Sequence, residues 1–269
     1  MNILSLCTGT VMEAGLLSLD LADDLQISEK AENDWVTNAD GAVEEFIIQR
    51  IHSHFPDHGI LAEESFANNI EELSKKEYVW IIDPIDGTKN YARQLPIYGI
   101  SIAVFKNSSH QQSKNFHYLS GELVAGAVYV PRLSELFYAE KGGGAFYNNK
   151  QITVSNTPTL KTSILATGFP PGDKTLSLKY FNKAAKHTAG IRRMGAASVD
   201  LCYTAAGRLD GFFEFALKPW DIAAGALILS EARGQITDIN GNPLDLFSGD
   251  LLATNGLIHQ ETLDLFSGL

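Results

Sequence analysis

Trp80-Ile81-Ile82-Asp83-Pro84-Ile85-Asp86-Gly87-Thr88 is the stretch of this sequence that says most about its fold and chemistry. The apolar run over residues 78–82 has the character of a strand and ends at the carboxylate of Asp83. A second carboxylate follows, and then Gly and Thr stand where a helix can begin. Such a corner can bind hard cations through oxygen and a phosphate through backbone amides. For these residues alone, an Asp-Pro turn with an Asp helix cap is the alternative.

The composition is typical of a soluble globular protein. A chain of 269 residues can bury one large core or two closely joined halves. The net charge of −11, without a basic block, argues against direct binding of nucleic acid through its phosphates. The same charge would repel a phosphate substrate unless bound cations reversed the local field.

The cysteines and the N-terminus bear on the cellular compartment. Cys7 and Cys202 are far apart and form no CxxC motif, and two free thiols are typical of a reducing cytoplasm. The N-terminus lacks the basic region and cleavage site of a signal peptide. The longest apolar blocks, residues 99–105 and 222–229, are too short to span a membrane. We therefore expect a cytoplasmic protein that has no membrane partner.

The first half predicts helices followed by a strand meander. Residues 11–25 are apolar at helical spacing, and a second helix starting at Asp40 carries a stripe formed by Val43, Ile47, Ile51 and Phe55. Strands are expected over residues 60–62 and 78–82, with a short helix after Asp86. An antiparallel meander is expected over residues 101–106, 123–130, 135–140 and 151–154. Glycines 142–144 are predicted to form a turn, and the polar residues 107–120 a loop.

The second half alternates between strands and helices. Strands are predicted over residues 163–167, 209–215 and 251–254, and helices over residues 176–188, 196–206, 222–233 and 259–266. This alternation predicts a layered α/β half with a mixed sheet. We expect a single domain, residues 1–269, with an antiparallel-sheet half over residues 1–155, a mixed α/β half over residues 156–269, and the site between them.

Three further carboxylates stand where an apolar element meets a loop: Asp40, Glu63 and Asp221. Singly, each is explained as a helix cap or an exposed corner. Together with Asp83 and Asp86 they would crowd one cleft, and crowded anions raise one another's pKa unless cations neutralise them. An all-oxygen ligand set favours Mg²⁺ or Mn²⁺ over Zn²⁺. His52, His54 and His58 lie around a helix end and are expected at the surface.

In their order along the chain these residues resemble the inositol monophosphatase family of Mg²⁺-dependent, lithium-sensitive phosphomonoesterases. The resemblance covers nearly the whole chain and includes four further segments: residues 126–131 with 135–137, 193–197, 211–214 and 219–225. It implies a layered αβαβα sandwich of the kind that the family shares with fructose-bisphosphatases. It also implies a homodimer. Arg233-Gly234 replaces the frequent Gly-Gly, and Lys89 stands where many inositol phosphatases have a neutral residue.

The resemblance also implies site residues, which bind two to three Mg²⁺ ions, with Mn²⁺ as a substitute. The first ion is held by Glu63, Asp83, the carbonyl of Ile85 and Thr88. The second ion is held by Asp83, Asp86 and Asp221, and a third is held loosely by Asp40 through water. The phosphate is bound by the amides of Gly87 and Thr88. The substrate's alcohol part faces Gly195, Ala196, Ala197, Glu214 and Asp221. Glu63 and Thr88 orient a metal-activated water, with Asp83 in the catalytic set, and no covalent phosphoenzyme is expected.

The substrate is the least determined feature. Glu214 can accept hydrogen bonds from a polyol, and it would repel a second phosphate. The basic residues in the relevant segments are Lys89, Arg93, Arg192 and Arg193. We therefore rank inositol 1-phosphate first, histidinol phosphate second, and 3′-phosphoadenosine 5′-phosphate and fructose 1,6-bisphosphate last. The alternative from another class is a non-catalytic regulatory binding protein, because a fold does not fix a function.

Overall fold

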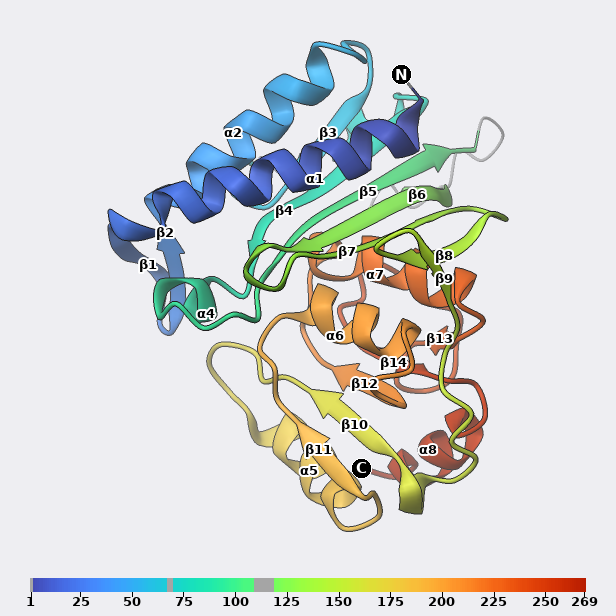
Figure 1. The fold of residues 1–269 in the computed structure, drawn as a ribbon. Helices are drawn as coiled ribbons and strands as arrows, with labels where there is room; N and C mark the ends of the chain where they lie inside the picture. The colour runs from blue at the N-terminus through green and yellow to red at the C-terminus, as the bar shows by residue number, and fades with distance from the viewer. Residues whose placement is uncertain (1, 67–69, 109–118) are drawn as a thin grey trace.

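The computed structural model describes residues 2–66, 70–108 and 119–269. Figure 1 shows helices and sheets in alternating layers. The outer helices are α1 (Ile3–Asp20) and α2 (Asn38–His52), and the central ones are α6 (Ala197–Ala205) and α7 (Pro219–Glu231). Beyond the second sheet lie α5 (Thr175–Ala185) and α8 (His259–Phe266). The expected αβαβα sandwich is confirmed.

The sheet beneath α1 and α2 has seven strands in the order β3-β4-β5-β6-β7-β8-β9. Their bounds are β3 Gly59–Ala62, β4 Tyr78–Asp86, β5 Gly99–Asn107, β6 Gly121–Val130, β7 Glu135–Glu140, β8 Gly144–Tyr147 and β9 Lys150–Ile152. Only the β3–β4 pair is parallel, so the predicted meander is confirmed. The last expected strand, 151–154, is instead a hairpin of β8 and β9 that turns at Asn148 and Asn149, where φ is positive.

Short elements connect these strands. They are α3 (Ile70–Ser74), α4 (Thr88–Ala92) and the 3₁₀ turns Leu21–Asp23, Pro131–Leu133 and Leu160–Thr162. The polar loop expected over residues 107–120 falls largely on residues 109–118, which lie outside the described part of the chain.

The second sheet has five strands in the order β11-β10-β12-β14-β13. Their bounds are β10 Ile164–Thr167, β11 Gly190–Arg192, β12 Gly211–Glu214, β13 Gln235–Thr237 and β14 Leu251–Thr254. β10 runs parallel to β11 and β12, whereas β14 is antiparallel to β12 and β13, so the sheet is mixed as expected. β11 and β13 were not predicted, because three residues are too few to display a period of two.

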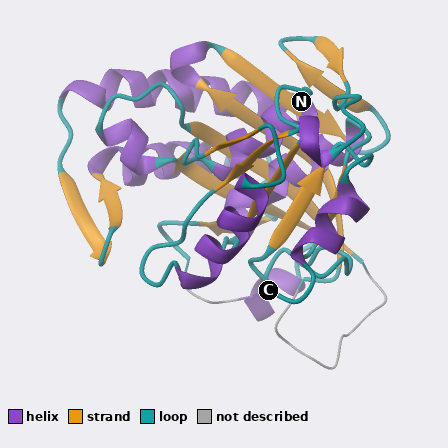
Figure 2. Ribbon diagram, turned by 90° about the horizontal axis from the view of Figure 1, so that it is seen from below, coloured by secondary structure: helices purple, strands orange, loops and turns teal. Residues whose placement is uncertain are grey.

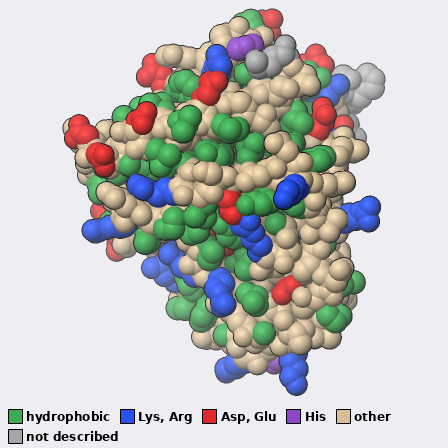
Figure 3. All heavy atoms as spheres, viewed as in Figure 1, with side chains coloured by type: hydrophobic (Ala, Val, Ile, Leu, Met, Phe, Trp, Pro, Cys, Tyr) green, Lys and Arg blue, Asp and Glu red, His purple; other side chains and the backbone are tan. Residues whose placement is uncertain are grey.

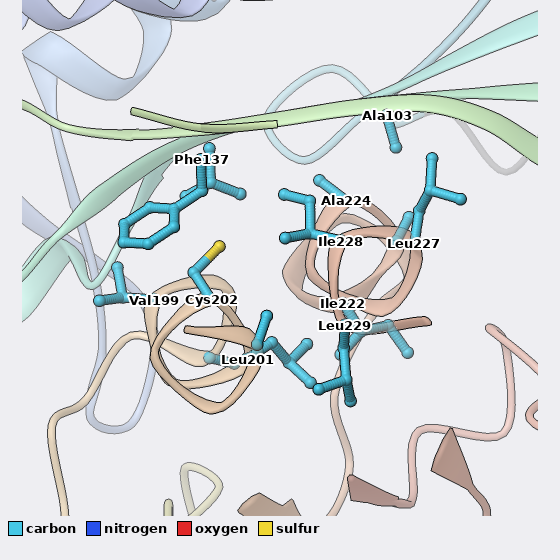
Figure 4. Packing of buried hydrophobic residues seen from close by; sticks show 14 of the residues in the cluster. Ala103, Phe137, Val199, Leu201, Cys202, Ile222, Ala224, Leu227, Ile228 and Leu229 are labelled. Atoms are coloured by element: carbon cyan, nitrogen blue, oxygen red, sulfur yellow. The ribbon is translucent and has the colours of Figure 1, made fainter. Parts of the chain in front are cut away.

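The main core lies between the two sheets, around α6 and α7. Figure 4 shows Ala103 and Phe137 pointing from the seven-stranded sheet toward Cys202 of α6 and Ile228 of α7. α7 is buried almost all round, because it has a sheet on each side. The two helices approach closely at Gly225, where an added Cβ would lie 2.5 Å from the Cβ of Leu201.

α2 carries the predicted apolar stripe, since Val43, Ile47 and Ile51 are fully buried. The helix starts at Asn38, and Thr37 is its N-cap. Asp40 is therefore not an N-cap: it is the third residue of the helix and closes a capping box with Thr37. Asp221 has the corresponding place in α7, which begins at Pro219 rather than at residue 222.

α1 begins at Ile3, well before the predicted start at residue 11. It also differs from the expectation that no apolar stretch is long enough to span a membrane. By length and composition, Ile3–Asp23 is apolar enough to cross a membrane, although no apolar block suggested this. In the fold, the inner face of the helix packs in the cluster above the seven-stranded sheet, through Leu6, Val11 and Ala14.

A hairpin that the sequence did not predict precedes α2. β1 (Ile27–Ala31) and β2 (Asp34–Thr37) form a two-stranded sheet of their own, and Asn33 at their turn has φ 61°. All residues of β1 are exposed. Figure 2 shows the hairpin at the left edge of the molecule, apart from both larger sheets.

Gly142 and Gly143 form a turn, as predicted, and Gly144 begins β8. The amides of Gly142 and Gly144 donate to the two carboxylate oxygens of Glu231, at 2.8 and 2.9 Å. Because Glu231 ends α7, this turn ties the meander to the second half of the chain. Arg233 lies just beyond α7 with φ 70°, a conformation that usually favours glycine.

His259, the first residue of α8, gives a testable pH dependence. Its ring is buried between the hydroxyls of Thr237 and Thr254, each 3.0 Å away, and burial lowers its pKa to about 4. In the unfolded chain His259 has a pKa near 6.5 and binds a proton below that pH, whereas the buried ring of the folded protein binds one only below about pH 4. The free energy of unfolding therefore falls as the pH drops below about 6.5.

We expect this term to cost about 2 kcal/mol of unfolding free energy between pH 7 and pH 5. Urea denaturation of the wild type and of His259→Gln at both pH values measures it, because other titrating groups cancel in the comparison. The wild type's advantage should shrink by that amount at pH 5. An advantage that does not change with pH would contradict the prediction.

Candidate active site

A cleft between the two halves collects most of the predicted site residues. Eight of them line it: Asp86, Gly87, Thr88, Gly195, Ala196, Ala197, Glu214 and Asp221. Three others, Asp40, Asp83 and Ile85, are almost fully buried. Glu63 follows directly after β3, which pairs with β4. The segments that the sequence analysis singled out therefore meet at one place, although they are up to 181 residues apart.

The strand-to-helix corner after β4 depends on a glycine. The pairing of β4 with β5 shifts between Asp83 and Asp86, and Oδ1 of Asp83 accepts a hydrogen bond from the amide of Ile85 at 3.1 Å. Gly87 then has φ 91°, and a Cβ there would lie 3.1 Å from Gly195 O and from the Cβ of Ala196. A larger residue is disfavoured on both grounds, and Gly87 brings the corner directly against the segment that enters α6.

Asp86 joins the two halves of the chain. Its Oδ2 accepts hydrogen bonds from the amide and hydroxyl of Ser198, at 2.7 and 2.5 Å, and its Oδ1 accepts one from the amide of Ala197 at 3.2 Å. The carboxylate thus occupies the N-terminus of α6, where free amides and the helix dipole favour an anion. Burial raises the pKa of Asp86 to about 6, and the hydrogen bonds from Ser198 and Ala197 oppose that rise.

Asp40 fixes the hydroxyl of Thr88. Thr88 Oγ1 lies 3.2 Å from Asp40 Oδ1 and 3.1 Å from Ile85 O, and its hydroxyl can donate a hydrogen bond to either oxygen. The other oxygen of Asp40 accepts the amide and hydroxyl of Thr37, at 2.8 and 2.6 Å. Burial raises the pKa of Asp40 to about 6. One residue thereby connects the hairpin, α2 and the corner after β4.

The remaining carboxylates crowd one another. Burial is the main cause that raises the pKa of Asp83 well above its usual value, that of Asp221 to about 7 and that of Glu63 to about 8. The charges of the neighbouring carboxylates add to each shift. Asp83 and Asp221 are close enough to share a hydrogen bond. Without a cation, the site therefore holds protons that it would lose if positive charge entered it.

A lysine that the sequence analysis missed faces this acidic site. Lys30 Nζ, from β1, lies 3.0 Å from Oε1 of Glu63 and 2.5 Å from Oε1 of Glu64. Of the salt bridges within the described ranges, those of Lys30 are the ones that reach a predicted metal ligand. No sequence signal marks this lysine, because it lies in an exposed strand with no apolar pattern.

Glu44 is a second residue that the sequence analysis missed. Its side chain is buried, and its Oε2 accepts the amide of Glu64 at 2.7 Å, which fixes the turn that carries Glu63. Glu44 lies one helical turn after Asp40 beside the apolar stripe of α2, so two carboxylates at this spacing were a usable signal. Both sides of the acidic site therefore rest on one face of α2.

The donor set fits a hard divalent cation. All candidate ligands are oxygens, and among them Asp83 and Asp86 are buried carboxylates with no ion pair among the described residues. In the described part of the chain, no three Asp, Glu, His or Cys side chains are yet arranged as a metal site. Asp86, Asp40 and Glu63 each accept a hydrogen bond from another partner, which is Ser198, Thr37 and Lys30 respectively. His58 lies elsewhere, stacked on Phe55 and hydrogen-bonded to Trp80.

The rim of the cleft is basic and partly aromatic. Lys89 and Arg193 line it together with Trp35 of the hairpin and Phe169. Neither Lys89 nor Arg193 forms a salt bridge with any residue that the structure describes. Figure 3 shows basic side chains gathered at the lower left of the visible face, around the position of α4 in Figure 1. A dianionic ligand would meet positive charge at the entrance and negative charge beneath it.

Residues 4–267 match the profile of the inositol monophosphatase family. The Nus factor SuhB of Pasteurella multocida is 42% identical over 245 residues, which cover 90% of this chain and 86% of that relative. An IMPase of Thermotoga maritima has a similar structure, with a TM-score of 0.85, 33% identity, and 99% and 97% of the two chains covered. A staphylococcal IMPase-II with bound inositol monophosphate has a TM-score of 0.79 and 30% identity, with 98% and 93% covered.

The crowding predicts that removing one negative charge stabilises the metal-free protein. When folding raises the pKa of a carboxyl, that carboxyl lowers the free energy of unfolding at every pH above its pKa in the unfolded chain. The loss reaches its full size above the pKa in the folded protein, which is about 7 for Asp221. In the absence of divalent cations at pH 8, Asp221→Asn should raise Tm by a few degrees, on the order of 1 kcal/mol. The gain should fade toward pH 5, where the wild-type carboxyl is protonated.

Differential scanning calorimetry in EDTA measures the change, with the exposed Asp57→Asn as the matched control. The control should leave Tm within a degree at both pH values. A lower Tm for Asp221→Asn at pH 8 would show that the carboxylate stabilises the fold more than it strains it.

Proposed function

The chain belongs to the inositol monophosphatase family, and from this premise we propose that it is a Mg²⁺-dependent hydrolase of small phosphate monoesters. One observation carries the proposal. The residues that match the family's metal and phosphate positions come from separate segments and line or underlie one cleft, which is acidic at its floor and basic at its rim. A phosphate monoester and divalent cations together complement this distribution of charge.

Mg²⁺ would be held by Glu63, Asp83, Asp86 and Asp221 together with the carbonyl of Ile85, and we expect two to three ions, with Mn²⁺ as a substitute. When bound, the ions supply positive charge against the phosphate and make a nearby water more acidic. Asp40 supports this site indirectly, because its oxygens already accept from Thr37 and Thr88.

The chain's own groups bind and orient the substrate in this proposal. The amides of Gly87 and Thr88 bind the phosphate at the start of α4, and Lys89 and Arg193 attract it to the cleft. Glu63 and the hydroxyl of Thr88 orient the attacking water. That hydroxyl is positioned for the task by Asp40 and by the carbonyl of Ile85.

We propose inositol 1-phosphate as the first substrate. Glu214 lies on the wall of the cleft beyond the phosphate corner, and burial raises its pKa to about 8, so in the metal-free protein it can both donate to and accept from hydroxyl groups. A staphylococcal relative has been solved with inositol monophosphate bound. Histidinol phosphate ranks second, and the bisphosphorylated compounds rank last, as the sequence analysis suggested.

A second candidate function is favoured by relatives whose name is Nus factor SuhB. We infer from that name a regulatory role in transcription, mediated by protein partners rather than by direct contact with nucleic acid, since the chain has a net charge of −11. The two functions are compatible in one chain. A cytoplasmic location, a homodimer and sensitivity to lithium complete the proposal.

Asp86→Asn tests the hydrolase function. The side-chain amide of the asparagine keeps one acceptor oxygen for Ser198, so the fold should survive. The substitution removes a charged carboxylate from the proposed metal ligands. We expect kcat to fall roughly 100-fold or more on inositol 1-phosphate at moderate Mg²⁺. A phosphate-release assay measures this, with circular dichroism as the check on folding. Near-normal turnover would reject the ligand assignment, and no turnover by the wild type on any phosphate monoester would favour the regulatory role.

Glu214→Leu tests the assignment of the substrate, because leucine has a similar size and can neither donate nor accept a hydrogen bond. Loss of the carboxyl should lower kcat/KM for inositol 1-phosphate roughly tenfold, because a hydroxyl partner is lost. The value for p-nitrophenyl phosphate, whose leaving group carries no hydroxyl, should change less than threefold. The wild type should prefer inositol 1-phosphate over histidinol phosphate, 3′-phosphoadenosine 5′-phosphate and fructose 1,6-bisphosphate. A preference for either bisphosphorylated compound would show that the role of Glu214 is wrong.

A further inference from the structure

Asn90 joins two sides of the cleft from behind its lining. Its side-chain amide donates one hydrogen bond to the carbonyl of Ile97, at 2.6 Å, and one to the carbonyl of Met194, at 2.8 Å. Asn90 is 9% exposed and lies in α4, directly after the proposed phosphate corner, whereas Met194 is 104 residues further along the chain. The side-chain amide has two N–H groups, and each of them has its own carbonyl here.

The segment that Asn90 reaches forms one wall of the cleft. This wall segment, residues 193–197, contributes most of its residues to the lining. Met194 and Gly195 belong to neither a strand nor a helix, and Gly195 has φ 83°. A Cβ at Gly195 would lie 3.4 Å from Nδ2 of Asn90, so the asparagine packs directly against this glycine.

Other contacts hold the elements on both sides of this joint. Asp40 and the carbonyl of Ile85 accept from the hydroxyl of Thr88 and fix the phosphate corner. Asp86 fixes the start of α6 through backbone amides. Asn90 provides the link between them that ends on irregular backbone, so the wall segment is the part that would move if this link were lost.

We propose that Asn90 is a positioning residue, which fixes the spacing between the phosphate corner and the wall segment and thereby the fit of the substrate's alcohol part. This inference rests on the proposed function. Asn90 does not touch the substrate, since it lies behind the residues that line the cleft. It acts through Gly195 and its neighbours in the wall segment.

Asn90→Asp tests the proposal at constant side-chain size. An ionised carboxylate has no N–H group, and its oxygens would face two carbonyl oxygens and push the wall segment away. We expect kcat/KM for inositol 1-phosphate to fall roughly 30-fold, because the alcohol part no longer fits the wall. The value for p-nitrophenyl phosphate, whose leaving group carries no hydroxyl, should fall roughly threefold or less.

Asn107→Asp is the matched control. Nδ2 of Asn107 also donates to two backbone carbonyls, those of Leu73 and Lys76, at 3.0 and 2.5 Å. Asn107 ends β5, whereas Gly99 at the other end of that strand pairs with the corner. The control should lose stability in the same way but keep the wild-type ratio of the two kcat/KM values.

Amide hydrogen exchange follows the wall segment without any turnover. In Asn90→Asp, exchange in residues 193–197 should be several-fold faster than in the wild type, whereas β6 and β7 serve as the unchanged internal reference. In Asn107→Asp the exchange of the wall segment should equal that of the wild type. Unchanged exchange of the wall segment in Asn90→Asp would show that the asparagine does not hold it.

The outcomes separate this inference from the proposed function. If the wild type hydrolyses neither compound, the proposed function fails, and the positioning role fails with it. If the wild type is active and Asn90→Asp lowers both kcat/KM values by the same factor, or lowers neither, only the positioning role is overturned. Asn90→Ser, which keeps one donor and adds no charge, repeats the comparison should Asn90→Asp fold poorly.

Discussion

Buried negative charge at the seam between two sheets is the constraint on which this structure depends. Carboxylates repel one another and lose hydration when they are buried, so each must be held by donors from the surrounding elements. Asp86 lies on the N-terminus of α6, Asp40 closes the capping box of α2, and Glu44 fixes the turn that bears Glu63. The ends of the main elements thus converge on the cleft because they supply the groups that hold the charge.

Much of the fold and site was predictable, because the informative residues stand where apolar patterns end. The stripe of α2 and the run before Asp83 identify buried elements, and the acidic residue at each end therefore points to a common location. Asp40 and Asp221 were assigned to helix starts correctly, but each is the third residue of its helix: Asp40 closes a capping box with Thr37, and Asp221 accepts a hydrogen bond from the amide of Lys218. A carboxylate is favourable both at the N-cap and at the third residue of a helix, so the sequence alone does not distinguish these two positions.

The features that were missed have no periodic signal. β1 is exposed throughout and shows no alternation of apolar and polar residues, so the hairpin was not predicted. The contact of Lys30 with Glu63, which lies 33 residues further along the chain, was not predicted either. β8 begins at Gly144, inside the run that was assigned to a turn. Arg233 adopts a left-handed conformation where glycine is usual, which shows that packing around the end of α7 overrides a local preference.

The place of α7 has a consequence for how the chain is made. The lower face of the seven-stranded sheet is complete in sequence by β9, yet its cover, α6 and α7, comes from residues 197–231. A chain emerging from the ribosome therefore presents Ala103, Phe137 and their neighbours to water, or to a chaperone, until those helices follow. Glu231, which binds the Gly142–Gly144 turn, is among the last residues of that cover. The first half therefore gains its full core only when residues 197–231 have been made.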